Sequence, residues 1–220
     1  MTPLEIEVKF YVEDLEKIRQ IIINSGAEKS KKHFELNICF EDSENSLIKK
    51  SSLLRLRKDS KNRLTFKLKP DDHDDNNNNN NTQFKIMKEL EVEVSSFSLM
   101  KQILEYLGFH EKQIYEKYRE IFILQNTQIC LDTMPFGNFI EIEGSKEKII
   151  ELSSKFGLKW EKRILNNYLE MFEYLKNKLS LSFNDLSFKN FKSVNLDLPD
   201  LDIKTFLACF EAENKHFHSK

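Results

Sequence analysis

At least six segments of the chain alternate apolar and charged residues, the pattern of a β-strand that is apolar on one face and charged on the other. In residues 4–10 every second side chain is apolar, and Glu5, Glu7 and Lys9 lie between them. The same alternation recurs at residues 54–57, 63–69, 86–94, 117–122 and 140–143. One charged strand face is ordinary in a solvated sheet. Six of them, with both signs of charge, predict a shared charged surface that has a function.

The sign of the charge changes from strand to strand. Residues 4–10 and 86–94 are mainly acidic, 54–69 are mainly basic, and 140–143 are acidic again. If these strands close into a barrel with their charged faces inward, both signs line one lumen. Burying each ion there without water would cost several kcal/mol. The lumen must therefore contain water, metal ions and a charged ligand.

The residue types in this lumen indicate what it binds. Carboxylates without nitrogen or sulfur ligands favour a hard cation such as Mg2+ or Mn2+. Clustered Arg and Lys side chains favour a chain of phosphates. Together they predict a complex of a divalent metal with a polyphosphate. For any one segment alone, the alternative is a solvated strand whose charges pair across the sheet.

The ordered set of charged motifs resembles the CYTH superfamily, also called the triphosphate tunnel metalloenzymes, whose signature is ExExK near the N-terminus. The matching pieces are Glu5-x-Glu7-x-Lys9, Arg55-x-Arg57, Lys67-x-Lys69, Glu89-x-Glu91-x-Glu93, Lys117-x-Arg119, and Asp132 followed by Glu141-x-Glu143. ExExK alone is a weak signal in so charged a chain. The whole set, in the order of the family and each on an expected strand, is specific, and it covers about residues 1–178.

The resemblance implies an α+β protein in which eight antiparallel strands close into a tunnel with a polar lumen, with helices packed outside. It implies a phosphohydrolase that uses Mg2+ or Mn2+ and acts on a small-molecule triphosphate such as tripolyphosphate, thiamine triphosphate or a nucleoside triphosphate. Two alternatives stay open. One is a class IV adenylyl cyclase that converts ATP to cyclic AMP and pyrophosphate. The other is a non-catalytic module that binds polyphosphate or nucleotides.

Each charged position receives a role on this basis. The expected phosphate-binding side chains are Arg55, Arg57, Lys67, Lys69, Lys117, Arg119 and Lys162. The expected metal ligands are Glu5, Glu7, Asp132, Glu141 and Glu143. The expected catalytic residues are Lys9, Glu89 and Glu91. Lys9 would stabilise charge at the transferred phosphorus, and the two glutamates would hold a second metal or orient the attacking water.

One position departs from the pattern of the family, whose members carry a basic residue shortly before a tyrosine in the C-terminal helix. Here that position is Asn166, two residues before Tyr168. The sequence predicts a helix over 161–178, which places Lys162 about one turn before Asn166 on nearly the same face. We therefore expect Lys162 to provide the missing charge, with Arg163, about 60° away, as the weaker candidate.

Composition argues against several classes of protein. The 34 basic and 36 acidic residues nearly cancel, so no binding of nucleic acid is expected. No run of about 18 apolar residues is present, and no membrane span or secretory leader is expected. Cys39, Cys130 and Cys209 have no CxxC spacing, which predicts free thiols in a cytoplasmic protein. A homodimer stays open.

The chain is expected to form one domain, residues 1–178, with an insertion and a C-terminal extension. Residues 71–84 contain six consecutive Asn and cannot build a core, so they are interpreted as a mobile hairpin insertion. Residues 179–220 carry several Phe side chains and are expected to pack on the barrel or to be partly disordered. A partner-binding helix is the alternative for this extension.

Overall fold

The computed structural model describes residues 4–70, 83–192, 194 and 203–211. Its strands are β1 (Leu4–Tyr11), β2 (Glu28–Lys29), β3 (His33–Glu41), β4 (Leu53–Lys58), β5 (Asn62–Leu68), β6 (Lys85–Glu93), β7 (His110–Leu124), β8 (Thr127–Met134) and β9 (Gly137–Glu143). Its helices are α1 (Leu15–Asn24), α2 (Ser46–Lys49), α3 (Phe97–Tyr106), α4 (Lys146–Lys155), the short 3-10 helix η2 (Trp160–Lys162), α5 (Tyr168–Leu179), α6 (Phe188–Phe191) and α7 (Ile203–Ala208).

Eight of these strands close into an antiparallel barrel. Around it the order is β7-β3-β4-β5-β6-β1-β9-β8, and β8 pairs back with β7. The two-residue strand β2 pairs with β7 outside this ring. The predicted α+β fold with a closed eight-stranded tunnel is therefore confirmed.

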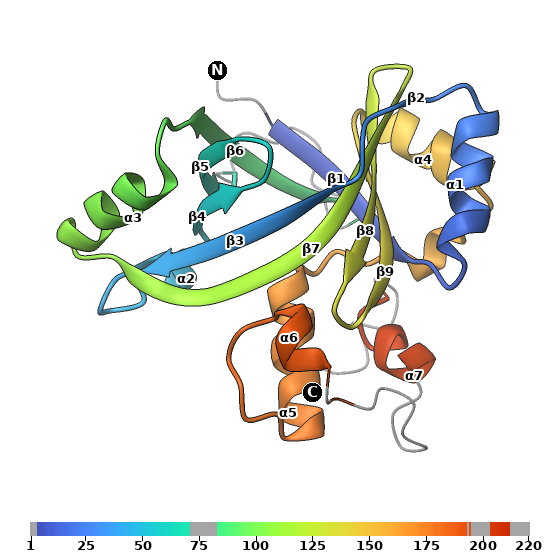
Figure 1. Cartoon of the computed structure of the whole chain (residues 1–220). Helices are drawn as coiled ribbons and strands as arrows, with labels where there is room; N and C mark the ends of the chain where they lie inside the picture. Colours follow the sequence, from blue (N-terminus) through green and yellow to red (C-terminus); the bar gives the residue numbers. More distant parts are fainter. Residues whose placement is uncertain (1–3, 71–82, 193, 195–202, 212–220) are drawn as a thin grey trace.

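Helices cover the apolar outer face of the barrel on two sides. Figure 1 shows α1 and α4 together at one side of the molecule, next to β8 and β9. Ile18 and Ile22 of α1 join Ile149 and Leu152 of α4 in one core cluster with the outer faces of the neighbouring strands. Leu104 of α3 packs in a second cluster with apolar residues of β3 and β4. Because the apolar faces point outward, the charged faces point into the lumen.

The inner face of the barrel turns apolar at one end. Tyr115 and Phe139 lie on the same strand faces as Lys117 and Glu141, and they pack in one cluster with Phe172 of α5. Figure 1 shows α5, α6 and α7 gathered at this end, below β7, β8 and β9. The lumen is thus closed by apolar side chains on the side where the C-terminal helices dock.

The segment after α5 is bound to the barrel by backbone as well as by side chains. Leu186 forms a parallel β-bridge with Tyr115 of β7, through hydrogen bonds with Ile114 and Glu116. Farther along, Glu211 bridges to Ile164. The described residues of the extension therefore add pairing partners to the edge of β7 and to the chain before α5.

The helix expected over 161–178 begins later, and this prediction was wrong for residues 161–167, about two turns. After η2 ends at Lys162, the chain is extended, and Ile164 exchanges two backbone hydrogen bonds with β1. The helix α5 starts after Asn167, whose side chain forms a capping box with Glu170. The strong N-cap and the pairing with β1 together fix the earlier residues outside the helix.

Two further expectations concern the insertion and membrane spans. Apart from residues 83 and 84, the predicted insertion at 71–84 lies outside the described residues. Among the helices that the structure does describe, none is long and apolar enough to cross a membrane.

Candidate functional site

Most of the charged residues expected at the site lie inside the barrel. The buried ones are Glu7, Lys9, Arg55, Arg57, Lys67, Lys117, Arg119, Asp132 and Glu141. Glu5, Glu89 and Glu143 are half-buried, and Glu91 and Lys69 are exposed. Lys69 follows the end of β5, so the structure does not bring it to the deeper basic residues.

Three glutamates lie on the lumen-facing sides of β1 and β9, where these two strands pair. Glu7 and Glu143 are partners across the two strands, and Glu5 shares the strand face of Glu7. Burial, together with repulsion from Glu5 and Glu7, raises the pKa of Glu143 to about 7. Burial and the charge of Glu7 also raise the pKa of Glu5. We call these three residues the acidic cluster, and the pKa is raised for two of them, Glu5 and Glu143.

Lysines on the neighbouring strands pair with part of this cluster. Lys85 Nζ lies 2.6 Å from Glu7 Oε1. Lys67 contacts Glu5, and its Nζ lies 3.3 Å from Glu89 Oε2. Burial by itself would raise the pKa of Glu7, but Lys85 outweighs it and holds this pKa at about 2. Glu5 and Glu7 are therefore each paired with an ammonium group, and for Glu7 this pairing lowers the pKa in spite of burial.

Glu141, the fourth glutamate on these strands, is more fully neutralised than the acidic cluster. Lys9 Nζ lies 2.7 Å from Glu141 Oε1, and Arg119 contacts the other carboxylate oxygen. Burial would raise the pKa of Glu141, yet Lys9 and Arg119 hold it well below its usual range. Through these two contacts, Glu141 links Lys9 of β1 with Arg119 of β7.

Asp132 is fully buried among donors. Arg119 donates from Nε and Nη2 over 2.7 and 2.5 Å. Lys117 Nζ donates over 3.0 Å and the Tyr168 hydroxyl over 2.9 Å, both to Oδ2. Three of these hydrogen bonds go to Oδ2 and one goes to Oδ1. The structure therefore places Asp132 among the basic residues rather than in the acidic cluster.

The opposite wall of the lumen, on β3, β4 and β5, is rich in donors. Arg57 Nε donates to Asn37 Oδ1 over 2.9 Å, and Arg55 Nη1 donates to the Tyr115 hydroxyl over 3.1 Å. Within the described part of the chain, Asn37 Nδ2, Arg55 Nε and Arg63 Nε are buried without a hydrogen-bond partner. Buried donors are normally paired, so these three are available to an anion with several acceptor oxygens.

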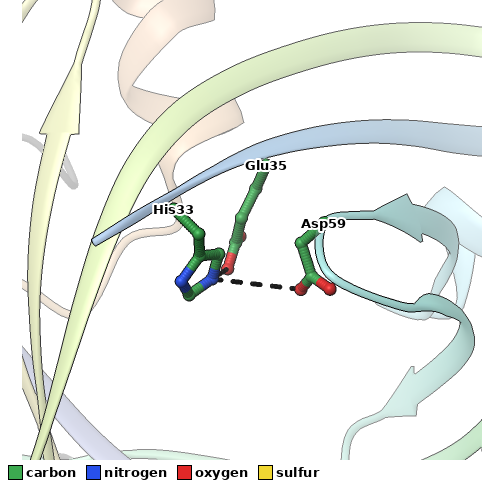
Figure 2. A group of neighbouring side chains, drawn as sticks. All are labelled: His33, Glu35 and Asp59. Atoms are coloured by element: carbon green, nitrogen blue, oxygen red, sulfur yellow. Dashed lines mark hydrogen bonds and ion pairs between the residues drawn. The ribbon is translucent and has the colours of Figure 1, made fainter. Parts of the chain in front are cut away.

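Among the described residues, one group of His, Cys and acidic side chains has its ligand atoms all within 4.8 Å of one another, and it lies at the start of β3. Figure 2 shows His33, Glu35 and Asp59 pointing toward one another, with His33 Nε2 at 3.2 Å from Glu35 Oε1. Cations already surround this group, because Glu35 Oε2 lies 3.4 Å from Arg57 Nε and 3.6 Å from Lys117 Nζ. Burial would raise the pKa of Glu35, but Lys117 and Arg57 hold it well below its usual range. We interpret the group as an ion-pair network and not as the metal centre.

The acidic cluster fits a hard divalent cation better. Its members are carboxylates only. Burial and repulsion from Glu5 and Glu7 raise the pKa of Glu143, and a bound cation would offset that repulsion. Oxygen donors of this kind match Mg2+ or Mn2+. The residues present are therefore consistent with the metal predicted from the sequence.

We expect Glu143→Gln to raise the Tm of the metal-free protein in a pH-dependent way. The pKa of Glu143 rises on folding from 4.5 to about 7, so the folded state binds more protons between these values and its stability falls as the pH rises through that window. Removing the carboxyl group should therefore change little near pH 4.5, help increasingly toward pH 7, and help by a constant amount above. Calorimetric unfolding in EDTA at several pH values measures this.

The matched control for this prediction is Glu93→Gln, which changes an exposed glutamate paired with Lys61 at 2.6 Å. Its Tm should not follow the same pH dependence. A gain for Glu143→Gln that shrinks as the pH rises would contradict the repulsion inferred for the acidic cluster.

Lys162 lies away from the other expected phosphate-binding residues. Its side chain is 58% exposed, and its Nζ lies 3.3 Å from Glu211 of the C-terminal extension. Arg163 is buried, but it donates to the backbone oxygens of Gln83 and Trp160. Lys162 therefore does not bring the expected basic charge into the lumen.

Sequence reasoning missed several polar residues of the lumen, namely Glu35, Asn37, Thr65, Lys85, Tyr115 and Tyr168. Strand alternation could have found three of them, because Thr65, Lys85 and Tyr115 share strand faces with residues that were selected. Glu35 and Asn37 lie on β3, where no residue was selected. Tyr168 had no such signal. Its place beside Asp132 depends on how α5 docks against the end of the barrel, which no local pattern specifies.

Comparison with known proteins agrees with this arrangement. Residues 3–165 match the family model described as the CYTH domain. A protein of Methanocaldococcus jannaschii with the name putative adenylate cyclase is 26% identical over 180 residues, which cover 76% of this chain and 98% of that protein.

Solved structures resemble the chain over the same extent. A Pyrococcus horikoshii protein is 28% identical with a TM-score of 0.62, covering 76% of this chain and 98% of the other. A Hippeastrum protein, described as a putative adenylyl cyclase with a dominant triphosphatase activity, is 16% identical with a TM-score of 0.55, covering 77% and 95%. At that identity the likeness shows the fold alone.

Proposed function

The chain belongs to the CYTH domain family, and from this we propose that it is a divalent-metal-dependent phosphohydrolase that acts on a triphosphate-bearing substrate. The observation that carries the proposal is the division of one lumen into two parts. In the acidic cluster, burial and repulsion from Glu5 and Glu7 raise the pKa of Glu143, and the facing wall has buried donors without a hydrogen-bond partner among the described residues. In a complex of a divalent cation with a polyphosphate, the cation would offset the charge of the carboxylates and the phosphate oxygens would accept hydrogen bonds from the buried donors.

The ion pairs of the free protein would be exchanged when such a complex binds. Lys67 and Lys85 neutralise Glu5 and Glu7. With a cation at the acidic cluster, these ammonium groups would become free to bind phosphate oxygens. The lumen would thereby keep its charges paired before and after binding, which avoids the cost of leaving a buried ion alone.

We assign the metal to Glu5, Glu7 and Glu143, with Glu141 next to them. When bound, Mg2+ or Mn2+ would neutralise phosphate oxygens and make the phosphorus more electrophilic. For Asp132 we propose a role other than the metal ligand expected from the sequence, because it accepts hydrogen bonds from Arg119, Lys117 and Tyr168. It would hold the basic side chains in place.

The basic residues of the lumen would bind the phosphate chain. Arg55 and Arg57 lie on one wall and Lys117 and Arg119 on the other, all of them buried. Charge-assisted bonds from such fixed donors stabilise the negative charge of the phosphoryl group during transfer. Lys9, only 2% exposed, would contact the transferred phosphoryl group.

A carboxylate near the phosphates would orient the attacking water. Glu89 is half-buried and lies 3.3 Å from Lys67 Nζ, which places it at the edge of the lumen. Glu91 is exposed and accepts a hydrogen bond from Thr65 over 2.8 Å. Glu89 is therefore the stronger candidate for this role, and Glu91 would support the wall.

A class IV adenylyl cyclase is the second candidate, favoured by the name of the Methanocaldococcus jannaschii relative. The same cation and basic residues would then bind ATP. The ribose 3′-hydroxyl would attack the α-phosphorus, forming a new ester bond as the bond to pyrophosphate breaks.

Incubation with tripolyphosphate, thiamine triphosphate and ATP, with Mg2+ or Mn2+, tests the proposal by the products formed. A phosphohydrolase releases orthophosphate, which 31P NMR resolves from pyrophosphate. Cyclic AMP and pyrophosphate from ATP would support the cyclase. Binding without any product would support a non-catalytic module, and neither binding nor product would contradict every form of the proposal.

A further inference from the structure

We propose that Tyr168 is a positioning residue that fixes the charged groups of the lumen from the C-terminal helix, an inference that rests on the proposed function of the tunnel. It contacts three charged side chains at once. Its hydroxyl donates to Asp132 Oδ2 over 2.9 Å. Its ring centroid lies 4.4 Å from Lys9 Nζ and 5.4 Å from Lys117 Nζ. The two lysines lie on β1 and β7, which β9 and β8 separate in the barrel, so Tyr168 joins strands that are not neighbours.

These contacts suit a fixed donor. Tyr168 is 6% exposed, and burial, with the charges of Asp132 and Glu141, raises its pKa well above the usual range. The phenol therefore stays protonated and can donate to Asp132. Its ring presents a negative face to the two ammonium groups, an attraction that strengthens when water is excluded.

The position of Tyr168 is set from outside the barrel. It is the first residue of α5, directly after the N-cap Asn167. Its ring packs against Phe136 and Phe139. The rest of α5 packs in one cluster with apolar side chains of α6 and α7. The family model ends at residue 165, so Tyr168 connects the lumen to the part of the chain that lies beyond that model.

This placement predicts a role in the reaction beyond stability. Asp132 fixes Lys117 and Arg119, and Tyr168 is its fourth donor. Lys9 contacts Glu141 on one side and the Tyr168 ring on the other. Loss of the ring would leave both ammonium groups less fixed while their strands stay in place.

Two substitutions separate the parts of this role. Tyr168→Phe removes the hydroxyl and keeps the ring, and Tyr168→Leu removes both. Phe172→Leu is the matched control, because it also replaces a buried aromatic side chain of α5 with Leu. Phe172 packs against Phe183 and Phe191. With tripolyphosphate and Mg2+, we expect kcat to fall about twofold to fivefold for Phe and about twentyfold or more for Leu, with a smaller change in KM. The control should stay within about twofold.

A second measurement needs no turnover. Trace acetylation followed by mass spectrometry reports how accessible Lys9 and Lys117 are in each protein. We expect at least about a fivefold faster reaction at both lysines in Tyr168→Leu and no such change in Phe172→Leu, although both lose packing of similar size.

Unchanged labelling in Tyr168→Leu overturns the proposal. So does an unchanged kcat in an enzyme that hydrolyses the substrate, or an equal loss of kcat in Phe172→Leu. If the wild-type protein shows no turnover and no binding, the proposed function fails instead, and labelling alone then decides whether Tyr168 holds the two lysines.

Discussion

Glu7→Gln is expected to lower metal-dependent turnover by about 100-fold or more while the barrel stays folded. Glu7 lies in the centre of the acidic cluster, across from Glu143 and two residues from Glu5. An amide keeps the shape of the side chain but removes its charge. Changes even to residues that only support a metal ligand typically cost 10–100-fold, so loss of a proposed ligand should cost at least as much. Initial rates across a range of Mg2+ concentrations measure the effect.

The variant removes an ion pair as well as a proposed ligand, so it needs a matched control. Lys61 and the exposed Glu93 form an ion pair at 2.6 Å on the rim, and Glu93→Gln should leave turnover nearly unchanged. A cooperative unfolding transition should persist in both variants. If Glu7→Gln keeps full activity at every Mg2+ concentration, the assignment of the metal to the acidic cluster is wrong.

Arg55→Ala is expected to weaken binding of tripolyphosphate by roughly 1.5–3 kcal/mol, or about 10–150-fold in Kd. The guanidinium is buried, and its Nε has no partner among the described residues. The neighbouring charges of Glu89 and Glu91 lie 3.9 Å away, too far for hydrogen bonds. A phosphate oxygen would therefore gain a charge-assisted bond at low cost. Calorimetry with Ca2+ in place of Mg2+ is one way to measure binding with turnover slowed.

Arg19→Ala is the control of the same type. Arg19 lies on α1 outside the barrel, where its Nε donates to Glu120 over 2.8 Å. It should leave the Kd of tripolyphosphate within about twofold. Equal and negligible effects of the two substitutions would mean that Arg55 holds the wall together without contacting a ligand.

Strand alternation predicted most of the charged side chains of the lumen, and the family resemblance predicted the eight-stranded barrel. The period of two fixes which side chains share a face, so Lys117 and Arg119, or Glu141 and Glu143, could be placed together without any structure. What alternation leaves open is which strands become neighbours. Asp132 was grouped with the acidic residues, but the register of β7 and β8 puts it opposite Arg119. Because cations surround Asp132, we propose that it holds basic side chains in place, whereas the carboxylates of the acidic cluster would bind a metal ion.

The positions of the residues just before and at the start of α5 could not be predicted for another reason. Lys162 was placed by assuming a continuous helix, whereas the chain there pairs with β1 and the helix starts at Tyr168. Helix limits depend on caps and on tertiary pairing, and both act over a few residues. The contact of Tyr168 with Lys9 arises only after α5 has docked, so it is a product of packing and not of local sequence.

The most direct test of the central claim is a crystal structure of the protein grown with tripolyphosphate and Mn2+, with the metal located by anomalous scattering. The account predicts a Mn2+ peak at Glu5, Glu7 and Glu143, and the phosphate chain between this cluster and Arg55. A metal bound instead at His33, Glu35 and Asp59 (Figure 2), or a tripolyphosphate bound outside the barrel, would contradict it.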